Sequence, residues 1–338
     1  MNVALLIASL VVGEAEFAGS IQMALPPQWA EVGVPWRLYW DTVGQYNGAW
    51  PYTETWALDP VPATGPVEAA DGLSWTPGAA ASGTYTLHVR VWNGGDEVAY
   101  KTAALTVSPA GALAGSVSVL GDSISAPNSW QADLADDEPS ISWLGTVALA
   151  NGLLTDSRGG WQFAYYASAT TYSGVSIAGC LVCGPRAYVN QAGEPSVIVW
   201  SCGHNDASGA ATAAATQAAY DYLDAMIALW RRDYPEVRHV IWTPTYGSSS
   251  AAMWAAYFPV GQCSHDQWCW EQRWSEAVRH VLARFGWRQG EGIYLAATAT
   301  GVDPGAAAYG PGDPVHPTAT GYQQIADSLR AVLAAAMR

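Results

Sequence analysis

Val117-Ser-Val-Leu-Gly-Asp-Ser-Ile-Ser125 is the stretch that decides how the rest of this chain is interpreted. Its apolar first half is typical of a buried β-strand, and that strand is followed directly by Gly121-Asp122-Ser123. Ligands of an open α/β sheet bind outside the carboxyl ends of its strands, so the pattern predicts a serine hydroxyl at a binding site. A serine becomes a good nucleophile only when a base takes its proton, which requires a histidine with an orienting carboxylate elsewhere in the chain.

Two later segments supply such groups. Asp313-Pro-Val-His316, near the end of the chain, places a carboxylate three residues before a histidine. Between the serine and this pair, a second apolar run over residues 196–202 ends in Gly203-His204-Asn205-Asp206. An asparagine NH2 at a strand end can donate to a developing oxyanion, as acyl transfer requires. His204 could contact substrate, although the sequence assures it no orienting carboxylate.

Taken together, these segments resemble the SGNH, or GDSL-type, hydrolase superfamily over residues 116–338. Gly121-Asp122-Ser123 is similar to its nucleophile block, Gly203-x-Asn205-Asp206 to its asparagine block and Asp313-x-x-His316 to its base block. Each motif alone is weak, but their order and their placement after predicted strands make the combination specific. For the superfamily's glycine block the best match is Ser173-Gly174-Val175-Ser176, with Gly179 as the alternative.

The resemblance implies a role for each matched residue. Ser123 would be the nucleophile, His316 its base and Asp313 the carboxylate that orients the histidine. The backbone N–H groups of Ser123 and Gly174 and the side chain of Asn205 would hold the oxyanion. The implied reaction is ester hydrolysis through an acyl-enzyme, and it requires no metal ion and no organic cofactor.

The pattern after residue 115 alternates strands and helices, as an α/β fold requires. The superfamily's flavodoxin-like three-layer α/β/α sandwich fits this order. Strands are predicted at 116–120, 162–166, 197–201, 239–242 and 292–295. Helices are predicted from apolar spacing at 210–232, 270–285 and 321–337. His239, at the start of a predicted strand, is expected to face solvent.

The first 107 residues are predicted to form an all-β domain. Alternating apolar and polar residues indicate strands at 20–25, 36–40, 84–92 and 99–107, and Asn93-Gly-Gly-Asp96 is a strong hairpin signal. The pattern resembles a bacterial immunoglobulin-like sandwich. Residues 108–115, rich in small side chains, are predicted to link this domain to the hydrolase domain at 116–338. Residues 1–12 favour a buried strand over a secretion signal, because no Lys or Arg precedes the apolar run and no cleavage site follows it.

Composition excludes some partners. The chain of 338 residues is 50% hydrophobic, so it can bury a substantial core, and its formal net charge is -15 with a single lysine, Lys101. Nucleic acid and anionic membranes bind clustered cations, so neither is an expected partner. The apolar run at the N-terminus is too short to span a bilayer, and no transmembrane segment is predicted.

The five cysteines leave their pairing open. Cys180-x-x-Cys183 lacks the second pair or the histidines that would complete a zinc site. Cys263 and Cys269 flank a short loop segment that a disulfide would stiffen, which is favoured only outside the reducing cytosol.

The natural substrate is the least determined feature. The connection 243–270 carries six aromatic side chains: Tyr246, Trp254, Tyr257, Phe258, Trp268 and Trp270. Such side chains either stack on sugar rings or pack the connection onto the protein body, and the sequence favours neither role over the other. Several SGNH-like enzymes remove acyl groups from polysaccharides, so the favoured substrate is an O-acetylated surface polysaccharide. The N-terminal sandwich would then dock on a partner at an extracellular or virion surface. The alternatives are a lipase or thioesterase on the same scaffold, and a non-catalytic glycan-binding protein of the adhesion or virion type.

Overall fold

The computed structural model describes most of the chain after residue 21. The described residues are 22–23, 25–39, 44–45, 53–69, 72–126, 130–168, 171–172, 175–176, 185–209, 213–245, 247–248, 250–257, 267–305 and 307–338. Several sequence-based predictions lie outside them, namely those on residues 1–12, on the oxyanion glycine (Gly174 or Gly179), and on Cys180, Cys183 and Cys263.

A five-stranded parallel sheet forms the centre of the second half of the chain. Its strands lie in the order β11-β10-β16-β17-β18, with β10 paired in parallel to both β11 and β16. The bounds are Gly115–Gly121 for β10, Ile141–Leu144 for β11, Val197–Ser201 for β16, Arg238–Trp242 for β17 and Ile293–Ala296 for β18. Numbered along the chain this order is 2-1-3-4-5, the order of flavodoxin-like folds.

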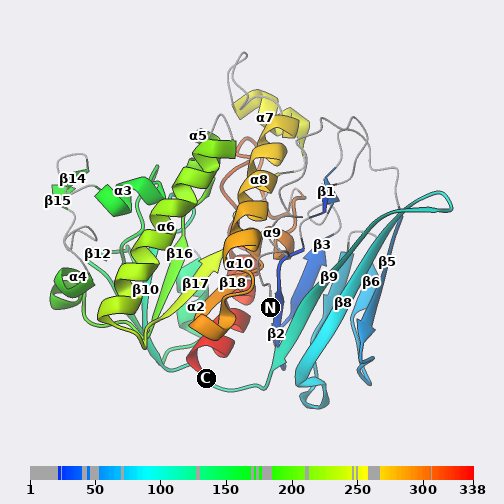
Figure 1. The fold of residues 1–338 in the computed structure, drawn as a ribbon, viewed down its shortest axis with the longest axis horizontal. Helices are drawn as coiled ribbons and strands as arrows, with labels where there is room; N and C mark the ends of the chain where they lie inside the picture. Colours follow the sequence, from blue (N-terminus) through cyan, green and yellow to red (C-terminus); the bar gives the residue numbers. More distant parts are fainter. Residues whose placement is uncertain are drawn as a thin grey trace, which may run out of the picture.

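Helices cover both faces of this sheet (Figure 1). Strand residues alternate between the faces: Val197 and Val199 pack with one layer, whereas Ile198 and Trp200 pack with the other. The first layer contains α2 and α10, and the second contains α4, α6 and α8. Their bounds are Trp130–Asp137 for α2, Pro185–Ala192 for α4, Ala213–Asp233 for α6, Gln267–Phe285 for α8 and Ala319–Met337 for α10. The predicted three-layer α/β/α sandwich is therefore confirmed.

One predicted strand is wrong. Within the predicted strand 162–166, residues 163–166 belong to helix α3, Phe163–Ser168, and the strand beside β10 is instead β11. Phe163 and Tyr166, three residues apart, both point into the core, and the Asp206 carboxylate accepts the Phe163 N–H at 3.1 Å. Tertiary contacts thus stabilise a helix in a segment whose aromatic content favours a strand.

Short elements complete this half of the molecule. They are β12 (Val147–Ala148), β13 (Leu154–Thr155), β14 (Thr171–Tyr172), β15 (Val175–Ser176), α5 (His204–Gly209), α7 (Ala251–Tyr257), η4 (Gln289–Glu291) and α9 (Thr298–Gly301). Among the helices that the structure describes, none has the length and apolar character needed to cross a bilayer.

The described part of the chain before residue 109 is a β-region, as predicted. One sheet has the order β2-β9-β8-β5 and the other β3-β7-β6, and their side chains share one core. The bounds are β2 Gln28–Glu31, β3 Trp36–Tyr39, β5 Thr53–Asp59, β6 Val67–Ala69, β7 Gly72–Trp75, β8 Gly83–Asn93 and β9 Asp96–Ser108, with a separate pair of β1 (Gln22–Met23) and β4 (Gly44–Gln45). The predicted hairpin is confirmed, since β8 and β9 pair antiparallel around residues 94–95. Assignment of this sandwich to the immunoglobulin-like type stays a prediction.

Strand β2 lies against the helical layer of α10. Trp29 is 5% exposed, belongs to the same core cluster as α10, and donates its indole N–H to the Leu295 carbonyl at 2.6 Å. Glu31 is fully buried and accepts from Arg330 at 3.0 Å and from Arg338 at 2.9 Å. Polar and apolar contacts therefore join the β-region to the C-terminal helix.

His239 contradicts the expectation that it faces solvent. Its side chain is fully buried in β17, and Nδ1 accepts the indole N–H of Trp200 at 3.2 Å. Burial, reinforced by the positive charges of Arg231 and Arg288, lowers the pKa of His239 to about 3. The ring therefore stays neutral and serves as a core side chain.

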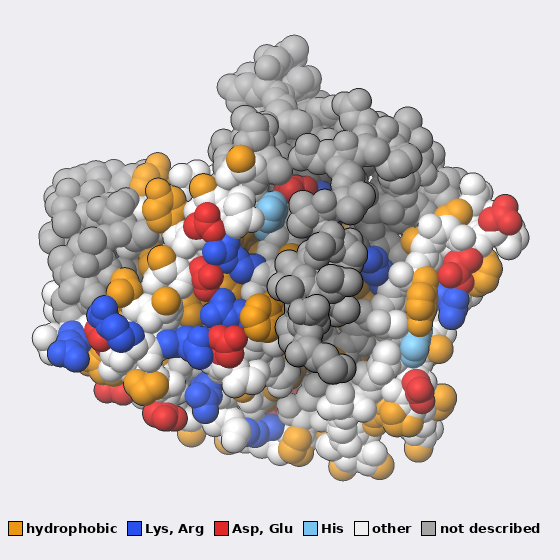
Figure 2. Space-filling model, viewed as in Figure 1, with side chains coloured by type: hydrophobic (Ala, Val, Ile, Leu, Met, Phe, Trp, Pro, Cys, Tyr) orange, Lys and Arg blue, Asp and Glu red, His pale blue; other side chains and the backbone are white. Residues whose placement is uncertain are grey.

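Arginines and carboxylates are interleaved on the face formed by α6 and α8 (Figure 2). Arg284 pairs with Asp224 at 3.2 Å, and Arg288 pairs with the same carboxylate at 2.6 Å and with Glu291 at 3.1 Å. These ion pairs tie the two helices to the η4 turn. Exposed pairs of this kind contribute about 0–1 kcal/mol each, so the buried core remains the main source of stability.

Candidate active site

The sheet topology brings the three sequence blocks to one place. The strand order reverses between β10 and β16, and a ligand site is expected outside the carboxyl ends of the strands at such a switch point. Ser123 follows β10, Asn205 follows β16 at the start of α5, and the Asp313–His316 turn precedes α10.

Ser123, His316 and Asp313 form a hydrogen-bonded row. The Ser123 Oγ lies 2.9 Å from Nε2 of His316, and Nδ1 of His316 lies 2.9 Å from Oδ2 of Asp313. Oδ1 of Asp313 also accepts the backbone N–H groups of Val315 and His316, each at 3.0 Å. The carboxylate thus fixes both the turn and the ring, with Nδ1 as donor and Nε2 placed to accept the serine proton.

Local packing explains the glycine that precedes Asp122 and Ser123. A Cβ on Gly121 would lie 2.1 Å from the Ser201 Oγ on the neighbouring strand, so a side chain cannot be accommodated there. The turn that follows is closed by the Asp122 carbonyl, which accepts Ser125 N–H at 3.2 Å, and by the Asp122 carboxylate, which accepts Ile124 N–H at 3.0 Å. Within the part of the chain that the structure describes, no acceptor takes the Ser123 N–H.

The asparagine block begins with a left-handed glycine. Gly203 has φ +131°, and a Cβ there would approach Pro244 Cγ to 2.8 Å. Asn205 then donates from its side-chain NH2 to the Trp161 carbonyl at 3.1 Å, while its own carbonyl accepts from the Gln162 side chain at 2.8 Å. These two bonds hold the block against the segment leading into α3.

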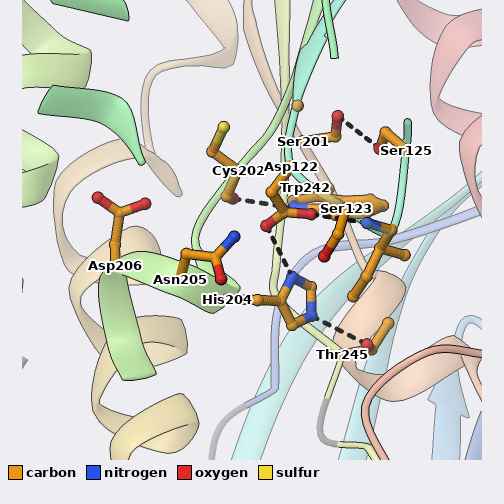
Figure 3. Close-up of polar contacts among 12 residues, drawn as sticks. Asp122, Ser123, Ser125, Ser201, Cys202, His204, Asn205, Asp206, Trp242 and Thr245 are labelled. Carbon is orange, nitrogen blue, oxygen red and sulfur yellow. Dashed lines mark hydrogen bonds and ion pairs between the residues drawn. The ribbon is translucent and has the colours of Figure 1, made fainter. Parts of the chain in front are cut away.

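His204 has two polar neighbours that the sequence did not assign to it. Figure 3 shows its ring between Asp122 and Thr245, with Nδ1 3.4 Å from Oδ2 of Asp122 and Nε2 3.0 Å from the Thr245 Oγ. The Trp242 ring packs edge-on at 5.5 Å between centroids. The carboxylate that was not evident for His204 in the sequence is therefore that of Asp122, the residue before Ser123.

Asp206 is a buried carboxyl group next to the asparagine. Both of its oxygens lie near the Phe163 N–H, at 3.1 and 3.3 Å. Burial is the main reason that the pKa of Asp206 is raised to about 7; the Phe163 N–H acts in the opposite direction, and the negative charge of Asp122 raises it further. The folded chain therefore keeps a proton here that an unfolded chain releases near pH 4.

This difference predicts a pH dependence of stability. The folded state binds the extra proton between about pH 4 and 7, so stability is lost as the pH rises through that window. Asp206→Asn keeps an acceptor for Phe163 and cannot ionise. We expect it to raise the free energy of unfolding at pH 8 by about 2–4 kcal/mol over wild type, and much less at pH 4, as measured by urea unfolding. An equal change at both pH values would contradict the raised pKa.

The two described aromatic side chains of the connection after β17 differ in burial. Trp254 is fully buried and donates to the Ser248 carbonyl at 2.7 Å, so this side chain packs the connection onto the body. Tyr257, at the end of α7, is 40% exposed. Partial burial and then the negative charge of Asp313 raise the pKa of Tyr257. The four other aromatic side chains of 243–270 lie outside the described side chains.

Several solved structures are similar to this chain. One is an acetyl esterase mutant with acetate ion, with 18% sequence identity, a TM-score of 0.43, and coverage of 64% of this chain and 97% of that one. Another is a GDSL-like lipase from Bacteroides thetaiotaomicron, with 14% identity, a TM-score of 0.40, and coverage of 64% and 87%. A third is phospholipase A1 from Streptomyces albidoflavus, with 15% identity, a TM-score of 0.39, and coverage of 64% and 99%. No curated protein matches the chain.

The family model gives the stronger result. The GDSL-like lipase/acylhydrolase family model matches residues 119–324 of the 338, which is more than half of the chain and includes all three blocks. This match and the α/β/α sheet with its polar groups at the switch point agree with each other. The chain therefore belongs to the GDSL-like lipase/acylhydrolase family and is a hydrolase.

Proposed function

We propose that the protein is a serine esterase that works through a Ser123–His316–Asp313 triad. The single observation that carries the proposal is the row of two 2.9 Å contacts from the Ser123 hydroxyl through both nitrogens of His316 to Asp313. Side-chain exposures of 33% for His316 and 37% for Asp313 leave the row accessible from solvent. An ester substrate can therefore approach the hydroxyl without a large rearrangement.

Acylation follows from this arrangement. The Ser123 Oγ attacks the ester carbonyl carbon while Nε2 of His316 takes the hydroxyl proton, and the Nδ1–H of the resulting imidazolium is stabilised by Asp313. The tetrahedral intermediate collapses when His316 returns that proton to the leaving alcohol oxygen. Water then attacks the acyl-enzyme, gives a proton to His316, and the acid is released as Ser123 recovers its proton.

Charge on the intermediate requires donors at the carboxyl ends of β10 and β16. We assign this role to the Ser123 N–H and the Asn205 side chain, with the backbone N–H of Gly174, or alternatively of Gly179, as the third donor. Removing one such donor from a serine hydrolase costs about 10²–10³ in kcat, so each of these groups contributes substantially to stabilisation of the transition state.

For substrate we propose O-acetyl groups of a polysaccharide, with the N-terminal sandwich holding the enzyme on the surface that displays the glycan. Support comes from Tyr257, which is 40% exposed at the end of α7 and whose pKa responds to the charge of Asp313 in the base block; we propose that the sugar ring stacks on it. The competing candidate is a lipase, since the family to which the chain belongs includes lipases.

The test compares acetate release from a panel of acetylated polysaccharides with hydrolysis of p-nitrophenyl esters from acetyl to palmitoyl. Faster cleavage of long chains with no acetate released would refute the glycan assignment.

Tyr257→Ala tests the stacking role separately from the chemistry. We expect the KM for the acetylated polysaccharide to rise about 5–10-fold, the equivalent of an aromatic contact worth about 1–1.5 kcal/mol, while kcat/KM for p-nitrophenyl acetate stays within about twofold. Tyr222→Ala is the matched control, because Tyr222 is 44% exposed on α6. A KM for polysaccharide that responds equally to both variants would argue against a sugar subsite at Tyr257.

A further inference from the structure

A buried histidine joins the two chain segments that carry the proposed oxyanion donors. Asp122 directly precedes Ser123, His204 directly precedes Asn205, and Nδ1 of His204 faces Oδ2 of Asp122 at 3.4 Å. Their side chains are 0% and 4% exposed. Figure 3 shows the contact running from the end of β10 to the start of α5, beside Ser123.

The Asp122 carboxylate is buried, and one of its two oxygens faces His204. Its Oδ1 accepts the Ile124 N–H, but Oδ2 has no hydrogen bond within the described part of the chain. A buried carboxylate oxygen without a hydrogen bond costs several kcal/mol, so the 3.4 Å ion-pair contact with Nδ1 of His204 is the interaction that determines where the carboxylate sits. Because the same carboxylate closes the turn at Ile124, its position also sets the orientation of the Ser123 backbone.

Two other roles for His204 are disfavoured by its surroundings. Direct contact with substrate would require an accessible ring, whereas both ring nitrogens face protein groups and the side chain is almost fully buried. The second role is that of a catalytic triad, because Asp122, His204 and Thr245 follow the order carboxylate, histidine, hydroxyl, with the Thr245 hydroxyl 3.0 Å from Nε2. Thr245 is fully buried, so its hydroxyl cannot reach a substrate carbonyl.

We infer that Asp122 and His204 are a positioning pair that fixes the distance between the Ser123 N–H and the Asn205 amide, the donors proposed for the oxyanion. The inference rests on the proposed serine-esterase function. Neither residue touches the reacting atoms; each acts through its neighbour in the chain. A donor displaced by about 1 Å can cost about 10²-fold in rate, so a contact that ties the two strand ends together affects kcat more than substrate affinity.

Two substitutions of His204 separate its contacts. In His204→Asn the amide lies near the position of Nδ1 and keeps a donor toward Asp122, whereas in His204→Gln it reaches toward Thr245 and leaves Asp122 without a donor. We expect His204→Gln to lower kcat for p-nitrophenyl acetate about 10–100-fold with KM within about threefold, and His204→Asn to remain within about fivefold of wild type. The double variant Asp122→Asn/His204→Gln should be no slower than His204→Gln alone, because the two residues act as one unit.

A second readout reports on the oxyanion donors without turnover. Diethyl p-nitrophenyl phosphate transfers its phosphoryl group to a reactive serine, and mass spectrometry follows the labelling of Ser123. The phosphoryl oxygen occupies the place of the oxyanion, so labelling of His204→Gln should slow by about the same factor as kcat. His239→Gln is the matched control: His239 is also fully buried, but it contacts Trp200 instead of a catalytic block, so only the thermal midpoint should fall.

The outcomes separate the pair from the wider proposal. If His204→Gln lowers the thermal midpoint but keeps kcat and the labelling rate within about twofold of wild type, the pair is structural and the inference is wrong. If His204→Asn is as slow as His204→Gln, the contact with Asp122 is not the one that matters. If wild type neither hydrolyses esters nor labels at Ser123, the proposed function itself fails, and the positioning role fails with it.

Discussion

Ser123→Ala is expected to lower kcat for p-nitrophenyl acetate by about 10³-fold or more without unfolding the protein. The hydroxyl is the atom that bonds to the ester carbon in the proposed reaction, and no neighbouring group can replace it. Among the described residues the side chain hydrogen-bonds only to Nε2 of His316, so its removal should leave the turn and the core unchanged. Circular dichroism and the thermal midpoint should match wild type, which separates loss of chemistry from loss of structure.

Two further variants test whether the loss is specific to Ser123: one on strand β10 and one at the histidine that contacts Ser123. Ser116→Ala, at the opposite end of β10, should keep activity within about twofold, because the Ser116 hydroxyl bonds Glu194 and Ser196 in the loop before β16. His316→Ala should lose about as much activity as Ser123→Ala, and the double variant should be little worse than either, since the residues act together. A loss below about tenfold in Ser123→Ala would show that Ser123 is not the nucleophile.

The elements with continuous apolar character were predictable from sequence. Strands β10, β16, β17 and β18 and helices α6, α8 and α10 lie within a few residues of their predicted positions, because buried parallel strands and long amphipathic helices leave strong periodic signals. The segment at 162–166 was not predictable in the same way. Its helix α3 depends on a contact with Asp206, more than forty positions away in the chain, which no local pattern records.

The three sequence blocks could be placed at one end of the sheet because the strand order and motif order agree. The links between the blocks could not. His204 appeared to lack a carboxylate because its partner, Asp122, lies eighty-two positions earlier, and only the pairing of β10 with β16 brings the two together. A histidine inside one block and an aspartate inside another were the available signal. His239 was misread for a related reason, since a polar residue at a strand start gives no indication of the helix layer that buries it.

Trp29→Ala is expected to destabilise the whole chain by about 3–5 kcal/mol, as truncation of a fully packed large aromatic side chain does. Trp29 lies in the N-terminal β-region but packs in the core cluster of the sheet and α10, with its ring 5.8 Å from that of Tyr294. The substitution opens a cavity there and also leaves the Leu295 carbonyl without its 2.6 Å indole donor. Urea unfolding followed by circular dichroism measures the change. Trp287→Ala is the control, because a side chain that is 71% exposed should change stability by less than about 0.5 kcal/mol.

The same measurement tests whether residues 1–107 and 116–338 are separate folding units joined by the segment 108–115. Gln28 bonds Thr300 at 3.2 Å, Tyr39 accepts from Gln324 at 3.1 Å and the buried Glu31 pairs with two arginines of the C-terminal helix region. If the β-region unfolded first, the hydrolase-side groups that bond it would lose their hydrogen-bond and ion-pair partners, which costs free energy. We therefore expect a single unfolding transition that moves as a whole in Trp29→Ala. Two transitions, with only the first one shifted and esterase activity lost only in the second, would instead make the β-region an independent module attached to a self-sufficient enzyme.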